Sequence, residues 1–213
     1  MPALFEPTRA LTLASASPRR KSLLQEAGLD LPVVLPSQFG PFSEPAPQTG
    51  ERPEAYVLRT ALAKASAVAV HSQENVILAA DTVVVLPETQ TILGKPADEA
   101  HALTMLRLLN GRSHHVITGC AICWNDGTLP RQELFADTAT VTFAAWPEPV
   151  LAAYACCGEP LDKAGAYAVQ GAGSFLIAGI TGSWSTVVGL PMPALIQRLL
   201  RLAFIRPTSQ TAS

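Results

Sequence analysis

The sequence NVILAADTVVVL, residues 75–86, decides the fold, because it is an apolar run with a single carboxylate, Asp81, at its centre. Such a run, rich in Val, Ile and Leu, predicts a buried strand. A carboxylate is costly to bury there unless it is paired, protonated or bound to a metal. We therefore expect Asp81 to be functional; the alternative is an aspartate at a strand end that bonds a neighbouring N–H. The D-x-D-x-T pattern of aspartyl-phosphate enzymes does not begin at Asp81.

An arginine pair lies upstream, where the short apolar run 11–15 leads into a helix start. Ser15, Arg19 and Arg20 stand in the pattern S-x-S-P-R-R. Free N–H groups and the dipole at a helix start favour an anion, and guanidinium groups match phosphate oxygens. Because two arginines in a first helical turn oppose the dipole, we expect a phosphate there. The alternative is a capped surface helix whose arginines are solvated.

Two lysines are weaker candidates. Lys64 lies at the margin of the apolar stripe of a helix expected over 53–71, where its side chain either follows the surface or reaches into a cleft. Lys95 follows Gly94 in a tight turn, where an ordinary exposed lysine is the alternative. No G-x-x-x-x-G-K-[ST] pattern is present, so this turn is not a P-loop.

Periodicity and turn residues divide the rest of the chain into helices and strands. Residues 36–52, rich in Pro, Ser and Gly, predict a long loop. The tripeptide Asn125-Asp126-Gly127 predicts a β-hairpin. The mixture indicates one α/β unit with a mixed sheet and no linker that divides it. Strands are expected over 11–15, 31–35, 75–86, 91–93, 114–124, 133–145, 164–170 and 174–180, and helices over 17–27, 53–71, 98–109, 147–157 and from Pro193.

The composition excludes several classes of protein. The chain has 213 residues, is 48% hydrophobic and has a net charge of −2, which favours a folded protein with a sizeable core. With 15 basic and 17 acidic residues, it has no basic stripe for a nucleic-acid polymer. The start has no secretory pattern, and the uncharged stretch 164–197 is broken by glycines, so no membrane span is expected. We expect a cytoplasmic protein.

The four cysteines are expected to be buried and reduced. Cys120 and Cys123 form a C-x-x-C within an expected strand, where residues three apart point to opposite faces and cannot easily share a metal. Cys156 and Cys157 are adjacent and equally badly placed for a shared metal. Small buried residues in a reducing compartment are the simpler interpretation.

Five segments, in this order, resemble the Maf family of nucleotide pyrophosphatases. The resemblance extends from about Leu11 to Leu199, and five motifs in the family's order make it specific. The segments are LTLASASPRRKSLLQEAGL (11–29), YVLRTALAKA (56–65), ILAADTVVVL (77–86), ILGKPADEAHALTMLRLLNGRSHHVITGCAI (92–122) and DKAGAYAVQGAGSFLIAGITGSWSTVVGLP (162–191).

The resemblance implies a two-lobed α/β fold with a central cleft, related to inosine-triphosphate pyrophosphatases, over residues 11–206. Residues 1–10 are then an N-terminal extension and 207–213 a frayed tail. It also implies a divalent metal, Mg²⁺ or Mn²⁺, and a homodimer. The implied catalytic residues are Asp81, Glu44, Lys64 and Lys95, with Asp81 and Glu44 as metal ligands. The implied substrate-binding residues are Ser15, Arg19, Arg20, Thr82 and Gln170.

The combination of Arg19, Thr82 and Gln170 resembles the subgroup that hydrolyses dTTP and UTP to the monophosphate and pyrophosphate. Two departures stand out: Glu44 lies in Pro-Phe-Ser-Glu-Pro, where many members have consecutive acids, and Thr186 replaces a common Asn. Two alternatives stay open, a nucleotide-binding regulator of septum formation with little turnover and a pyrophosphatase for purine nucleotides such as ITP. The expected partner in each case is a nucleoside triphosphate.

Overall fold

The computed structural model describes residues 3–72 and 75–208. Its strands are β1 (Phe5–Pro7), β2 (Leu11–Leu13), β3 (Val76–Leu86), β4 (Thr91–Leu93), β5 (Ser113–Asn125), β6 (Pro130–Phe143), β7 (Ile177–Thr181) and β8 (Ile205–Pro207). Its α-helices are α1 (Pro18–Glu26), α2 (Pro53–Ala69), α3 (Glu99–Leu109), α4 (Glu148–Ala155), α5 (Trp184–Val188) and α6 (Met192–Arg201). Short 3-10 turns are η1 (Pro36–Phe39), η2 (Glu159–Asp162), η3 (Ala164–Ala166) and η4 (Ala172–Leu176).

One mixed sheet organises the molecule, in the strand order β2-β3-β5-β6-β7, with β4 paired to β3 beside this path. Strands β2 and β3 are parallel, and the other neighbours are antiparallel. The long strands β5 and β6 form the hairpin that residues 125–127 predicted. The α/β class with a mixed sheet, expected from the sequence, is confirmed.

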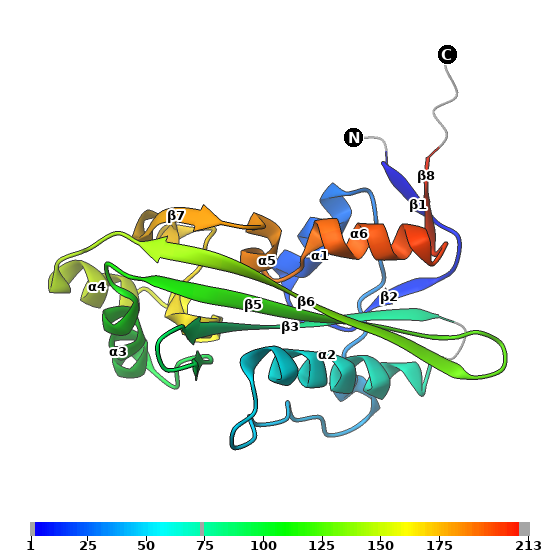
Figure 1. The fold of residues 1–213 in the computed structure, drawn as a ribbon, viewed down its shortest axis with the longest axis horizontal. Coiled ribbons are helices and arrows are strands. Elements are labelled where there is room, and N and C mark those ends of the chain that lie inside the picture. Colours follow the sequence, from blue (N-terminus) through cyan, green and yellow to red (C-terminus); the bar gives the residue numbers. More distant parts are fainter. Residues whose placement is uncertain (1–2, 73–74, 209–213) are drawn as a thin grey trace, which may run out of the picture.

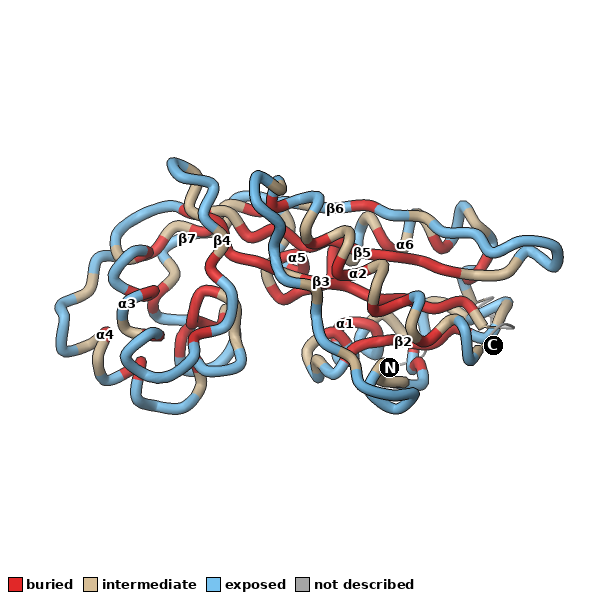
Figure 2. The backbone as a smooth tube through the Cα atoms, turned by 90° about the horizontal axis from the view of Figure 1, so that it is seen from below, coloured by how far each residue is buried: buried red, intermediate tan, exposed pale blue. Residues whose placement is uncertain are grey.

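The helices cover the two faces of this sheet unequally (Figure 1). Helix α2 covers one face, where it meets odd-numbered residues of β3 such as Ile77 and Ala79. On the other face the even-numbered residues enter two separate cores: Leu78 packs with α1 and α6, and Val84 packs with α3 and α4. Figure 2 shows the buried backbone of β3 and β5 continuing between these two lobes.

Polar residues interrupt both faces of β3 at the junction between the lobes. Asp81 lies on the α2 face between the apolar neighbours Ala79 and Val83, and Thr82 lies on the opposite face between Ala80 and Val84. The strand therefore carries apolar residues on each side of the junction and hydrogen-bonding side chains at the junction itself.

Two expected strands are wrong. Residues 31–35 contribute only one bridge, between Val33 and Leu13, and Val33 is 36% exposed, so the apolar run reflects partial packing rather than a sheet position. Residues 164–170 form η3 and an irregular segment, because Gly165 has a φ of +69°, which takes the chain out of the extended conformation. The strand expected over 174–180 begins only at Ile177.

Both ends of the chain lie together in a second, two-stranded sheet. Strand β1 pairs with β8, so that Phe5 lies opposite Pro207, and the Thr208 amide donates to the Leu4 carbonyl. Pro207 and Thr208, which were expected to belong to a frayed tail over 207–213, are thus held by β1 and by Leu4, and residues 209–213 lie outside the described residues. Within 3–72 and 75–208, no helix combines the length and the apolar character that crossing a membrane requires.

Gly119 allows α2 to lie close to the sheet beside the buried carboxylate. It is the cross-strand partner of Asp81 on β5, and a Cβ there would lie 2.7 Å from the Val57 carbonyl carbon and 2.9 Å from the Leu58 nitrogen. Because these are backbone atoms of α2, a larger residue has to displace the helix.

We expect Gly119→Ala to lower the free energy of unfolding by about 1–3 kcal/mol, since the added methyl group overlaps with the α2 backbone. Urea denaturation monitored by circular dichroism measures this change. Gly179→Ala on β7 is the matched control, because a Cβ there meets no atom within 4 Å. Equal stability of the two variants would contradict the close packing of α2.

Candidate active site

A cavity opens where β3 loses its neighbour on one edge. Strand β2 pairs with β3 up to Leu78 and β4 pairs with it from Val84, while β5 takes the opposite edge throughout. Among the described residues, 79–83 have no strand partner on this edge. The cavity that opens here has a volume of about 810 Å³ and is lined by both lobes and by the loop 40–52.

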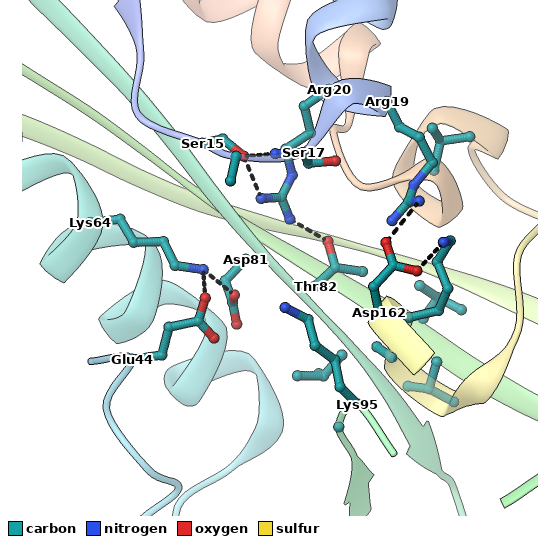
Figure 3. A pocket seen from close by; sticks show the side chains of 18 of the residues that line it. Ser15, Ser17, Arg19, Arg20, Glu44, Lys64, Asp81, Thr82, Lys95 and Asp162 are labelled. Atoms are coloured by element: carbon teal, nitrogen blue, oxygen red, sulfur yellow. Dashed lines mark hydrogen bonds and ion pairs between the residues drawn. The ribbon is translucent and has the colours of Figure 1, made fainter. Parts of the chain in front are cut away.

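Asp81 and Glu44 meet at the ammonium group of Lys64 (Figure 3). The Lys64 Nζ donates to Asp81 Oδ1 at 2.7 Å and lies 2.8 Å from Glu44 Oε1. The side chains of Asp81 and Lys64 are each 10% exposed, whereas that of Glu44 is 48% exposed. Asp81, whose carboxylate is costly to bury, is therefore paired with a lysine. That lysine points inward from the edge of the apolar stripe of α2.

The surrounding cations favour the ionised form of Glu44. Burial raises the pKa of the Glu44 carboxyl, but the hydrogen bond from Lys64 and the charges of Lys64 and Lys95 outweigh it, so the pKa is lower than its ordinary value. At neutral pH the site accordingly presents Glu44 as a carboxylate facing the cavity.

The loop that carries Glu44 is fastened to α2 at both ends. The Phe39 ring stacks on His71, just beyond the C-terminus of the helix, with ring centroids 4.1 Å apart. Arg59 bonds both carboxylate oxygens of Glu51 and the Ala46 carbonyl, and these hydrogen bonds lower the pKa of Glu51 to about 2. These contacts position Glu44 relative to the helix that carries Lys64.

Arg20 is a buried donor in the opposite wall. Its Nε donates to the Gly189 carbonyl at 2.7 Å, its Nη1 to Ser15 Oγ at 3.1 Å and its Nη2 to Thr82 Oγ1 at 3.0 Å. Burial lowers the pKa of the guanidinium, and the charge of Asp81 opposes this effect. Since a guanidinium has five N–H donors, two remain beyond these bonds.

Further cations line the cavity. Lys95 points inward from the turn after β4, toward the side of Asp81 (Figure 3). Arg19 Nη1 lies 4.0 Å from the Asp162 carboxylate, which also pairs with Lys163. The Gly165 amide donates to the Gly94 carbonyl at 3.0 Å, which brings the segments of Lys163 and Lys95 together.

The structure gathers most of the expected site residues and separates one. Gln170 is exposed and is not among the residues that line the cavity. The expected residues that line it together are Ser15, Arg19, Arg20, Glu44, Lys64, Asp81, Thr82 and Lys95.

Two cavity residues, Asp162 and Lys163, escaped the sequence reasoning. The sequence gives no local signal for them, because the left-handed conformation of Gly165 and the 2.8 Å at which a Cβ there would lie from Val84 Cγ2 are seen only in the structure.

A buried histidine supports another part of the cavity wall. His114 is fully buried, and its Nε2 lies 2.8 Å from the hydroxyl of Tyr167, which lines the cavity. The ring also packs edge-on against Phe143. Burial lowers the pKa of His114 to about 4, so this side chain is neutral at physiological pH.

We expect the fold to lose stability as the pH falls from about 6.5 to about 4. In this window the unfolded chain protonates His114 and the folded protein does not, which costs up to about 3 kcal/mol. Urea denaturation at several pH values measures the loss, and His114→Gln should reduce its slope relative to His115→Gln. An unchanged slope would mean that His114 titrates freely.

Together, the fold and the site define a two-lobed α/β protein whose cleft combines two carboxylates with several cations. A family model described as "Maf-like protein" matches residues 10–202, and the chain belongs to this family. The chain is 47% identical over 197 residues to a dTTP/UTP pyrophosphatase of Nitratidesulfovibrio vulgaris, with 92% of this chain and 90% of that protein covered.

Two further relatives have the same name. A dTTP/UTP pyrophosphatase of Lawsonia intracellularis is 42% identical over 208 residues, covering 95% of this chain and 88% of that protein. One from Bacillus cereus is 41% identical over 194 residues, covering 90% and 94%. A solved structure, the Ham1 protein of Staphylococcus aureus, has a TM-score of 0.45 and 17% identity, with 63% of this chain and 71% of that chain covered.

Proposed function

We propose that this chain is a nucleotide pyrophosphatase that hydrolyses dTTP and UTP to the monophosphate and pyrophosphate. The observation that carries the proposal is the cavity around Asp81, where cations from four segments surround one ion-paired carboxylate. A triphosphate is the kind of ligand that such an excess of cations suits. The relatives named dTTP/UTP pyrophosphatase support this substrate class.

In the proposed reaction, water attacks the α-phosphorus in line with the departing pyrophosphate. Asp81 accepts the proton of this water, and Lys64, 2.7 Å away, holds the carboxylate in position. Lys95, Lys163 and Arg19 offset the negative charge that grows on the departing pyrophosphate. The bond between the α-phosphorus and the bridging oxygen breaks, and the monophosphate stays with the nucleoside.

The residues present fit a divalent metal of the Mg²⁺ type. Asp81 and Glu44 supply hard carboxylate oxygens on the same side of the cavity, and Mg²⁺ is bound by one or two carboxylates together with substrate phosphates and water. No cluster of three or more His, Cys, Asp or Glu side chains suited to a metal occurs in the described part of the chain, which argues against an all-protein cage. When bound, such an ion neutralises phosphate charge and lowers the pKa of its water.

Thr82 is the proposed contact to the nucleobase, because its side chain lines the cavity beside Arg20. Gln170 does not line the cavity, but its neighbour Val169 does. We propose that Gln170 contacts the base when substrate binding moves this segment toward the cavity. A homodimer and a cytoplasmic location complete the proposal; all four cysteines are free, which suits a reducing compartment.

We expect Asp81→Asn to lower the turnover of dTTP by about 10²- to 10⁴-fold, because an amide cannot accept the proton of the attacking water. Pyrophosphate release in the presence of Mg²⁺ measures this loss. Asp98→Asn is the matched control, since this residue caps α3 and does not line the cavity, and asparagine also caps helices well.

The same assay separates the alternatives. Wild-type protein that releases pyrophosphate faster from dTTP and UTP than from CTP, ITP or N7-methyl-GTP supports the proposal. Preference for ITP would favour the purine enzyme, and tight binding without release would favour the regulator. Activity in Asp81→Asn equal to that of the wild type would remove Asp81 from the mechanism.

We expect Lys163→Met to lower the kcat/KM for dTTP about tenfold, because it removes from the cavity wall a charged donor that offsets the charge on the departing pyrophosphate. Steady-state kinetics measure the change. Lys21→Met is the control, because this exposed residue of α1 does not line the cavity. A kcat/KM that falls equally in both variants would indicate a general charge effect rather than a contact.

A further inference from the structure

A row of polar side chains crosses the sheet between the two apolar cores. Thr82 on β3 lies opposite Thr118 on β5, and Thr118 lies opposite Asp137 on β6. Thr186 of α5 packs on this row and donates to the Asp137 carboxylate. Thr118 and Thr186 are fully buried.

The direction of the hydrogen bonds in this row is fixed at both ends. Arg20 can only donate, and its Nη2 lies 3.0 Å from Thr82 Oγ1. The Thr186 carbonyl can only accept, and it receives the hydroxyl of Thr118 at 2.8 Å. The contact of 3.0 Å between the two threonine hydroxyls must therefore use the hydrogen of Thr82, because Thr118 has already given its own.

This direction determines what Thr82 offers to a ligand. A hydroxyl has one hydrogen and two lone pairs. The hydrogen goes to Thr118 and one lone pair receives Arg20, so a single lone pair remains on an oxygen whose side chain lines the cavity. Toward the cavity, Thr82 is an acceptor and not a donor.

We propose that Thr118 is a specificity-determining residue that acts through Thr82. By taking the hydrogen of Thr82, it makes the site select a base whose ring nitrogen carries a hydrogen, as the imide N–H of uracil and thymine does. The corresponding ring nitrogen of cytosine carries a lone pair, which a second acceptor repels. This inference rests on the proposed function and deepens it.

The test compares UTP with CTP in Thr118→Val and Thr118→Ser. Valine fills the same space but accepts no hydrogen bond, so the Thr82 hydroxyl is free to turn and donate to cytosine. We expect the ratio of kcat/KM for UTP to kcat/KM for CTP to fall about tenfold in Thr118→Val. This is the effect expected when the hydrogen bond between Thr82 and the base reverses its direction. Serine keeps the hydroxyl, and the ratio should stay within about twofold of the wild type.

Thr12→Val is the matched control, because Thr12 is a buried threonine of the same sheet that accepts from Asn75 and does not line the cavity. Its UTP over CTP ratio should not change. An equal loss for both nucleotides in Thr118→Val, or a ratio in Thr118→Ser as low as in valine, would overturn the role in specificity. A wild-type protein that hydrolyses neither UTP nor dTTP would overturn the proposed function instead.

Discussion

The ion pair between Asp81 and Lys64 is the interaction on which the rest of the site depends. A carboxylate in the middle of an apolar strand costs several kcal/mol if it is left charged and unpaired. The lysine that compensates it comes from α2, and α2 lies close to the sheet because Gly119, the neighbour of Asp81 on β5, has no side chain. Because Asp81 has to be paired with Lys64, the distance between α2 and the strands β3 and β5 is fixed.

A second constraint is the interrupted edge of β3. One continuous strand serves both lobes, but its partners β2 and β4 are separate pieces of chain with a gap between them. The gap admits a ligand to the middle of the sheet without breaking the pairing of β3 with β5, and the polar row of Thr82, Thr118 and Asp137 crosses the sheet at the same level. The cleft and the boundary between the two cores are therefore the same feature.

Much of this arrangement was predictable from single residues. Three features stood out because their charges are unusual for their local structure, and all of them line the cavity. They are the lone carboxylate of β3, the lysine at the margin of an apolar stripe and the arginines at a helix start. The C-x-x-C was also correctly placed, since Cys120 and Cys123 belong to cores on opposite faces. The expectation that Cys156 and Cys157 are buried is wrong, because both lie exposed at the end of α4. The threonines of the polar row gave no such signal, because threonine is an ordinary residue in strands. Residues 164–170 were mistaken for a strand because an apolar pattern does not reveal that Gly165 turns the chain.

The fastening of the loop 40–52 has a consequence for how much entropy a ligand has to remove. The stack of Phe39 on His71 and the Arg59 contacts hold that loop along α2 before any nucleotide arrives. The freedom that Glu44 loses is thus lost during folding, and a group ordered in advance adds more to catalysis than one that substrate binding has to order. The long, proline-rich segment is thus held along α2 by contacts within the chain itself.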